Sequence, residues 1–154
     1  MRELKDLSKV LLVLNKNQGE ILLSTSYESL YKHGYRPYVR WGVLNETLAA
    51  ACILESGVLD RAKHTGKLYL WDPFCGSGSF LIESLMYALD QPVRELAKEY
   101  PFEHWPIHEH DKYEEFRAEL EGLKKIKSDL DIQIIGSDIS LHAIETSTKN
   151  MEHA

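Results

Sequence analysis

Two short apolar runs near the N-terminus are separated by a polar stretch. Residues 9–14 and 20–25 are rich in Leu, Ile and Val, and residues 15–19 between them are Asn-Lys-Asn-Gln-Gly. Aliphatic runs bounded by Asn and Gly are typical of paired β-strands. The pattern predicts a β-hairpin with a five-residue loop, and residues 1–40 are expected to hold this hairpin and a connecting segment.

Residues 45–56 show the next regular pattern. Leu48, Ala51, Cys52 and Glu55 recur at helical spacing. Asn45 can cap the first turn of this helix, and a glycine at position 57 can end it.

A second helix is predicted for residues 79–89, which are apolar on nearly every side. Glu83 is the exception, and a carboxylate on a buried helix needs a partner. We expect backbone amides or a hydroxyl near the preceding turn to supply it, so that Glu83 has a structural role.

The two remaining apolar runs each lead to an acidic residue. Residues 68–71 are followed by Asp72-Pro-Phe-Cys-Gly-Ser-Gly-Ser79, and the apolar strand predicted within residues 131–140 ends on Asp138, just before a helical pattern over 141–151. Gly76 and Gly78 let the backbone approach a ligand closely, and the first amides of a helix favour a ligand carboxylate. Carboxyl ends of strands in open α/β sheets form ligand crevices, so this pattern predicts a cofactor pocket.

The residues around the turn distinguish between three kinds of ligand that such a turn can bind. A phosphate-binding loop needs Lys and then Ser or Thr after the second glycine, but Phe80 and Leu81 follow Ser79. A dinucleotide site needs a third glycine where Leu81 stands. S-adenosylmethionine (SAM) remains, with Asp72 near its ammonium and Asp138 accepting bonds from its ribose hydroxyls. The 138 − 76 = 62 positions between Gly76 and Asp138 predict an insertion at residues 91–130.

Several motifs together resemble a known family, the SAM-dependent RNA methyltransferases that modify the 2-amino group of guanine and often carry a THUMP domain. The resembling segments are residues 72–79 with Ile82-Glu83, residues 30–36, residues 45–51, residues 102–106 and residues 136–139. The segment at 102–106 is similar to one in the bacterial large-subunit ribosomal RNA members. The likeness covers nearly the whole chain.

The resemblance implies an α/β fold, a partial doubly wound, Rossmann-like methyltransferase core preceded by the hairpin. Residues 41–154 would form the N-terminal half of the methyltransferase domain. The cofactor-binding residues predicted from the turn, the second acid and the resemblance are Asn45, Glu46, Asp72, Pro73, Phe74, Cys75, Gly76, Ser77, Gly78, Asp138 and Ile139. For Glu46, contact with the methionine end of SAM and a first-turn acid that complements the helix dipole remain equal alternatives.

The family's catalytic motif, Asn or Asp followed by Pro-Pro and an aromatic residue, does not occur in the sequence. We therefore expect no catalytic residue in these 154 residues, and read the chain as the cofactor-binding half of a methyltransferase. The edge of the strand at 68–71 is then expected to pair with a second copy or with the remainder of the domain. A DNA adenine methyltransferase and a non-catalytic partner subunit remain alternatives.

Composition and net charge bear on whether this chain contacts RNA and on where in the cell it is found. A net charge of −6 argues against a broad RNA-gripping surface, so structured RNA is expected to contact other regions. The only mixture of basic and aromatic residues, at positions 31–40, permits RNA contact or ordinary packing. Two cysteines without a disulfide framework, and no apolar run long enough for a membrane span, predict a cytoplasmic protein.

Three histidines in the insertion, His104, His108 and His110, raise the question of a metal site. Pro106 interrupts a shared helical face between the first two, and no cysteine is nearby. Cys75 follows Phe74 and not Pro, unlike the nucleophile of cytosine methyltransferases. We therefore predict no metal site, and a structural role for Cys75 in shaping the turn.

Overall fold

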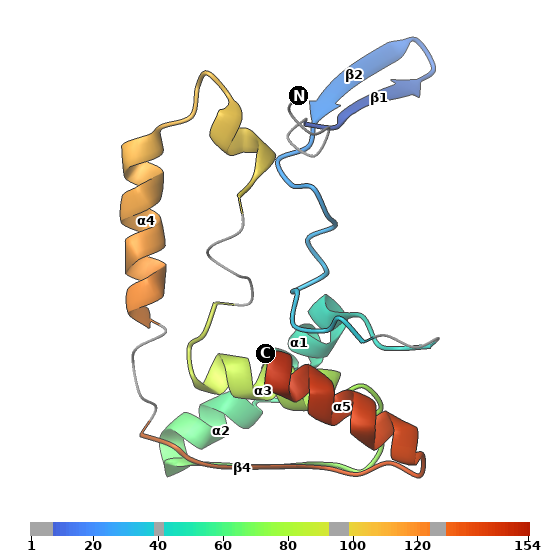
Figure 1. Cartoon of the computed structure of the whole chain (residues 1–154), viewed down its shortest axis with the longest axis vertical. Coiled ribbons are helices and arrows are strands. Elements are labelled where there is room, and N and C mark those ends of the chain that lie inside the picture. The colour runs from blue at the N-terminus through green and yellow to red at the C-terminus, as the bar shows by residue number, and fades with distance from the viewer. Residues whose placement is uncertain (1–7, 39–41, 93–98, 124–128) are drawn as a thin grey trace.

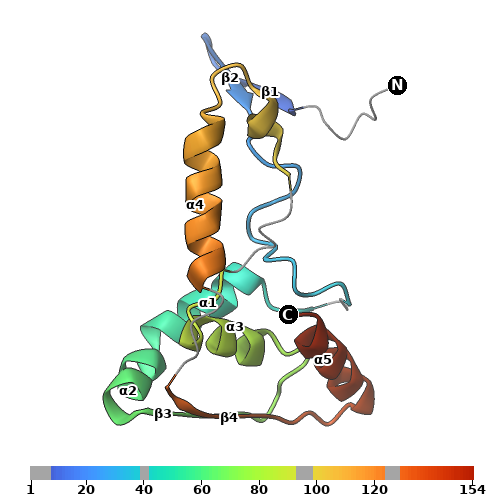
Figure 2. The same cartoon turned by 60° about the vertical axis from the view of Figure 1, so that its left-hand side comes forward.

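The computed structural model describes residues 8–38, 42–92, 99–123 and 129–154, and shows a small parallel sheet under a layer of helices (Figures 1 and 2). Strand β3 (Lys67–Asp72) pairs in parallel with β4 (Asp131–Gly136), with Leu68 beside Ile132 and Asp72 beside Gly136. Both predicted strands and their order are confirmed. Because they are parallel, their carboxyl ends and the acids that follow lie at the same edge of the sheet.

Four helices lie on one side of this sheet (Figure 2). They are α1 (Glu46–Glu55), α2 (Val58–Thr65), α3 (Ser79–Ala88) and α5 (Leu141–His153). The predicted helices α1, α3 and α5 are confirmed. Helix α2 was not predicted, because its only buried residue is Ala62 and its sequence has no wide apolar stripe.

Caps in the sequence determine where these helices begin. The Asn45 side chain accepts a hydrogen bond from the Leu48 amide, and the Ser140 side chain accepts one from the Ala143 amide. Gly57 adopts a φ of 69° after α1 and also precedes α2, so one left-handed residue separates two helices.

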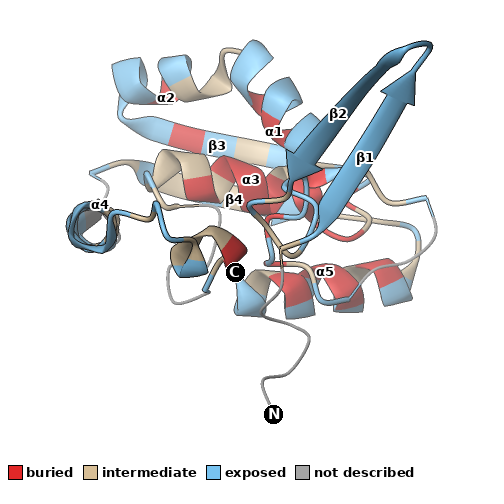
Figure 3. Cartoon of the chain, turned by 90° about the horizontal axis from the view of Figure 1, so that it is seen from above, coloured by how far each residue is buried: buried red, intermediate tan, exposed pale blue. Residues whose placement is uncertain are grey.

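The core is built around α3, where Ile82 and Met86 pack with Tyr35 and with Met151 of α5, and buried residues also lie on β3 and α1 (Figure 3). Leu68 on β3, Ala49 on α1 and Ile82 on α3 have no exposed surface. The alternation of a strand places the neighbouring side chains on the opposite face, where Tyr69 is 55% and Trp71 66% exposed. In the described part of the chain β3 pairs only with β4, so this face and edge of the sheet carry exposed apolar surface.

The predicted N-terminal hairpin is present at the other end of the molecule (Figure 1). Strands β1 (Val10–Asn15) and β2 (Gln18–Leu23) are antiparallel, with Asn15 opposite Gln18. The predicted five-residue loop is wrong. The turn contains only residues 16 and 17, because Lys16 adopts a positive φ of 54° and lets the polar residues on both sides pair.

The insertion forms a separate arm. A short 3₁₀ helix (Pro101–His104) precedes α4 (His110–Leu123). Phe102 packs on Tyr100, His108 and Tyr113, and Trp105 donates a hydrogen bond of 2.7 Å to Ser8 at the base of the hairpin. His108 thus belongs to an aromatic cluster.

The described residues contain no group of three His, Cys, Asp or Glu arranged to hold a metal ion. None of the helices described is long and apolar enough to cross a membrane.

Candidate functional site

Backbone hydrogen bonds continue beyond the two parallel strands and bring the turns after them together. The Ser137 amide donates to the Asp72 carbonyl, and the Ser137 carbonyl accepts from the Cys75 amide, both at 2.9 Å. The glycine turn, which we define as residues 73–78, is therefore fixed against the segment that carries Asp138.

Helix α5 supports the glycine turn from its other side. Gly78 has a φ of 85°, and a Cβ atom there would lie 2.5 Å from Oγ of Ser147 on α5. Asn150, fully buried on the same helix, donates a hydrogen bond of 3.0 Å to the Ser77 carbonyl. Only glycine fits at position 78, both for its backbone conformation and for its contact with α5.

Asp138 joins the two turns directly. Its Oδ2 accepts a hydrogen bond of 3.0 Å from the Gly76 amide, and its Oδ1 accepts one of 2.9 Å from the Ser140 amide. These backbone bonds, that of Ser140 most and then that of Gly76, hold the pKa of Asp138 below its ordinary value. The carboxylate is thus ionised at neutral pH, and each oxygen keeps capacity for a further donor.

Asp72 is held differently. Its Oδ1 accepts a hydrogen bond of 3.0 Å from the Phe74 amide. Its Oδ2 is buried and has no hydrogen-bond partner among the described residues. Buried carboxylate oxygens are normally paired, so this atom is available to a donor.

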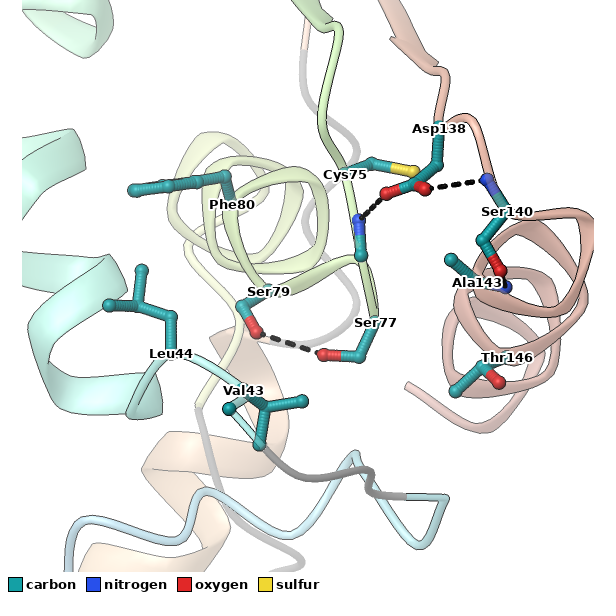
Figure 4. Close-up of a pocket in the computed structure, with 12 residues that line it drawn as sticks. Val43, Leu44, Cys75, Ser77, Ser79, Phe80, Asp138, Ser140, Ala143 and Thr146 are labelled. Carbon is teal, nitrogen blue, oxygen red and sulfur yellow. Dashed lines mark hydrogen bonds between the residues drawn. The ribbon is translucent and has the colours of Figure 1, made fainter.

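A cavity of about 280 Å³ opens between the glycine turn, α5 and residues 42–44 (Figure 4). Cys75, Gly76, Ser77 and Asp138 from the predicted set line it, together with Ser79 and Thr146, which were not predicted. The Cys75 thiol is buried, and burial raises its pKa, so it is a neutral side chain of the wall.

The other predicted residues lie outside the wall of this cavity. Asp72, Pro73 and Gly78 belong to the same turn region, and Phe74 and Ile139 are largely exposed beside it. Asn45 caps α1 and, with Glu46, lines a second cavity of about 580 Å³, on whose wall Val43 also lies. The structure thus brings Asp138 and the glycine turn to one cavity, and places Asn45 and Glu46 at its neighbour.

Glu46 has partners that the sequence did not reveal. Its Oε1 lies 3.3 Å from Nε of Arg36, and its Oε2 accepts a hydrogen bond of 3.3 Å from the His33 amide. Both charged side chains are almost completely buried. An acid at the start of an apolar helix was the available signal, because a buried carboxylate requires a charged or hydrogen-bonding partner.

Glu83 has the structural role that was expected, with different neighbours. Its fully buried carboxylate accepts a hydrogen bond of 2.7 Å from the Tyr35 hydroxyl, and Nδ1 of His33 lies 2.7 Å from the same oxygen. Tyr35, His33 and Arg36 are thus packing residues of the segment for which RNA contact was an alternative. Arg40 lies outside the described residues.

Comparison with protein families gives one match over most of the chain. The model of the family described as UPF0020, RMKL-like, methyltransferase domain, matches residues 33–154. Curated relatives include two proteins named ribosomal RNA large subunit methyltransferase K/L. The chain is 33% identical over 140 residues to that of Shewanella pealeana and 33% identical over 145 residues to that of Allochromatium vinosum. The alignments cover 89% and 91% of this chain, and 19% of each relative.

Solved structures with the same fold are also longer than this chain. SMU.472, described as a methyltransferase complexed with SAH, is 30% identical with a TM-score of 0.76. A predicted N6-adenine-specific DNA methylase from Listeria monocytogenes is 28% identical with a TM-score of 0.75. Each match covers 95% of this chain and 36% of the other. These similarities confirm the predicted α/β, Rossmann-like methyltransferase core.

Proposed function

The chain belongs to the UPF0020 family of RMKL-like methyltransferase domains, and on this premise we propose that it is the SAM-binding part of an RNA methyltransferase. The reaction would move the methyl group of SAM to the exocyclic amine of a guanine in ribosomal or transfer RNA. The chain spans about a fifth of the length of the curated relatives it matches, so their whole activity is part of the proposal.

The Asp138 carboxylate carries this proposal. It lies at the carboxyl end of β4, lines the cavity and is held in place by two backbone amides. Its remaining lone pairs suit the two hydroxyls of a ribose, a role that needs an ionised acid in a fixed position. SAH, the product of methyl transfer from SAM, is present in the structurally similar SMU.472.

Other residues of the site suit the remaining parts of the cofactor. The unpaired Oδ2 of Asp72 suits the ammonium of the methionine end, and the amides of the glycine turn suit its carboxylate. Ile139 and Phe74 are strongly exposed apolar side chains beside the acids, and they offer a surface to the purine. Asn45 and Glu46 border the cofactor from the neighbouring cavity.

Calorimetry with SAM and SAH tests cofactor binding. We expect one site per chain and about 10- to 100-fold weaker binding by Asp138→Ala, because hydrogen bonds to a charged group are removed. Asp138→Asn, which keeps an acceptor, should weaken binding less. Asp129→Ala, which removes a carboxylate outside the cavity, is the matched control. Absence of heat, or equal affinity of wild type and both Asp138 variants, would contradict the proposal.

The acceptor is tested by methyl transfer. Radiolabelled SAM is supplied with ribosomal RNA, transfer RNA or DNA, and the methylated nucleoside is identified after digestion. Since the sequence lacks Asn or Asp followed by Pro-Pro, we expect transfer only when a second polypeptide carrying that motif is added. Label on the 2-amino group of guanine supports the proposal.

Label on the 6-amino group of adenine in DNA would support the alternative suggested by the name of the Listeria protein. Binding of SAM without transfer to any acceptor under all conditions would favour a non-catalytic partner subunit.

We further propose that structured RNA contacts regions other than this acidic chain. The exposed face and edge of β3 would pair with the remainder of a methyltransferase domain or with a second copy. Sedimentation that shows only monomers at high concentration would count against self-pairing.

Two free cysteines, Cys52 exposed and Cys75 buried, remain the basis for the proposed cytoplasmic location.

A further inference from the structure

We propose that Arg36 is a positioning residue of the cofactor cavity, which joins two separate segments of the cavity wall through one guanidinium group. This inference rests on the proposed SAM-binding function. Arg36 belongs to the segment before α1, 41 and 43 positions from the two serines that it contacts, yet its side chain is only 5% exposed. It makes direct contacts with three groups of the wall.

A single nitrogen of Arg36, Nη1, contacts both segments of the cavity wall. The two N–H groups of Arg36 Nη1 are shared among three acceptors, the Leu44 carbonyl at 2.8 Å, Ser79 Oγ at 2.5 Å and Ser77 Oγ at 3.2 Å. Leu44 and the two serines belong to different segments that line the cavity, and the serines lie between Leu44 and α5 (Figure 4). The Ser77 and Ser79 hydroxyls are also 3.5 Å apart, so a single donor orients both.

Glu46 forms an ion pair with the other side of the guanidinium, whose Nε makes no hydrogen bond within the described residues. Its Oε1 lies 3.3 Å from Nε, and its Oε2 is occupied by the His33 amide. This buried carboxylate compensates the charge of Arg36, and the planar fork can then contact the acid and the wall at the same time. Lysine has a single ammonium on a flexible stem, and cannot make both sets of contacts in one geometry.

The contacts of Arg36 should raise the affinity of the cavity for its ligand. Without Arg36, the Leu44 segment and the two serines lose their common donor, and the cavity must be ordered when a ligand binds. Ordering costs free energy that a pre-organised site avoids, so affinity falls. Arg36 does not line this cavity but lines its neighbour beside Glu46, so it acts on a ligand in this cavity through the wall.

Four variants of the 154-residue chain separate this role from stability. Arg36→Met removes the guanidinium and leaves Glu46 unpaired, and Arg36→Met with Glu46→Gln removes both charges. Glu46→Gln alone is the reference for that double variant, and Arg36→Lys keeps the charge. Arg61→Met, an exposed arginine on α2, is the matched control. Thermal melting and SAH calorimetry are measured for all.

We expect Arg36→Met to lose both stability and SAH affinity, the latter by about tenfold. The double variant should regain part of the stability but bind SAH about tenfold more weakly than Glu46→Gln. Arg36→Lys should melt close to wild type with weakened binding. Equal SAH affinity of the double variant and Glu46→Gln would overturn the proposal, because Arg36 would then only pair with Glu46.

Hydrogen exchange distinguishes failure of this inference from failure of the proposed function. If the wild type does not bind SAH, the cofactor proposal is wrong. Exchange of the amides of residues 74–80 then still tests Arg36. It should be about tenfold faster in the double variant than in Glu46→Gln and unchanged in Arg61→Met. Equal exchange in the double variant and Glu46→Gln would overturn the positioning role.

Discussion

The Tyr35 hydroxyl donates a 2.7 Å hydrogen bond to the fully buried carboxylate of Glu83. It joins the segment before α1 to the helix that follows the glycine turn. Burial of the ring, and then the hydrogen bond and negative charge of Glu83, raise the pKa of Tyr35 far above its ordinary range. The hydroxyl therefore stays protonated and remains a donor, which the buried carboxylate requires.

Removing this donor should destabilise the fold. We expect Tyr35→Phe to lower the free energy of unfolding by about 1–3 kcal/mol, because Glu83 loses a partner while it stays buried. Tyr31→Phe, which removes the hydroxyl of an exposed tyrosine of the same segment, is the control. Urea unfolding measures both. A loss as small as that of the control would show that His33 alone satisfies Glu83.

The same bond predicts a loss of stability at high pH. The folded pKa of Tyr35 is raised above the unfolded one, so its contribution is complete below the unfolded pKa. It decreases as pH rises above about 10, where the unfolded tyrosine ionises and the folded one does not. Unfolding measured from neutral to alkaline pH should show a steeper decrease for wild type than for Tyr35→Phe. Parallel curves would contradict this.

Asn150 connects three segments that are far apart in the sequence. Its side chain accepts from the Tyr38 amide at 3.3 Å, and donates to the carbonyls of Tyr38 at 3.1 Å and Ser77 at 3.0 Å. Asn150→Leu should cost about 1–3 kcal/mol and weaken SAH binding, because buried backbone groups beside the cavity lose their partners. Gln133→Ala, at an exposed position on β4, should stay within about 0.5 kcal/mol.

The sequence predicted the strands of the sheet well, and it predicted the contacts of the helices and segments above the sheet less well. Apolar runs, a glycine turn and an acid after each strand were local signals, and they were enough to predict β3, β4 and the location of Asp138. Helix α2 gave no such signal, because it buries a single alanine. Lys16 gave none for a two-residue turn, since lysine rarely adopts a positive φ.

The partners of buried polar residues were the hardest part to predict. The sequence showed that Glu83 needs a partner, but not that Tyr35, 48 positions away, supplies it. Arg36 was noted only as part of a basic and aromatic segment that permits RNA contact, and Asn150 was not singled out. Their acceptors are backbone carbonyls and serine hydroxyls that are brought together only by folding. Such contacts have no periodicity and no fixed spacing, and they require three-dimensional information.

Asp138 predicts a dependence on acid pH. Its folded pKa lies below the ordinary value of 3.8, so its contribution to stability is complete above that value and is lost as pH falls through the folded pKa. The stability difference between wild type and Asp138→Asn should be constant from about pH 5 to 8 and should shrink in stronger acid. A carboxyl titration by NMR with a midpoint above 3.8 would contradict the assigned backbone bonds.

Gly78 provides the sharpest test of how α5 supports the cavity. Gly78→Ala introduces a Cβ at a φ of 85° and 2.5 Å from Ser147 Oγ, so strain and a steric clash act together. The backbone conformation alone should cost about 1–3 kcal/mol. Adding Ser147→Ala removes the clash but not the strain, so the double variant should recover only part of the stability. Gly122→Ala, inside α4 with open space around its Cβ position, should instead stabilise the chain by about 0.4–1 kcal/mol. If Gly78→Ala does not lower the free energy of unfolding, the turn does not have the described conformation. If adding Ser147→Ala restores the full stability of the wild type, the close approach of α5, and not the left-handed backbone, is what requires glycine.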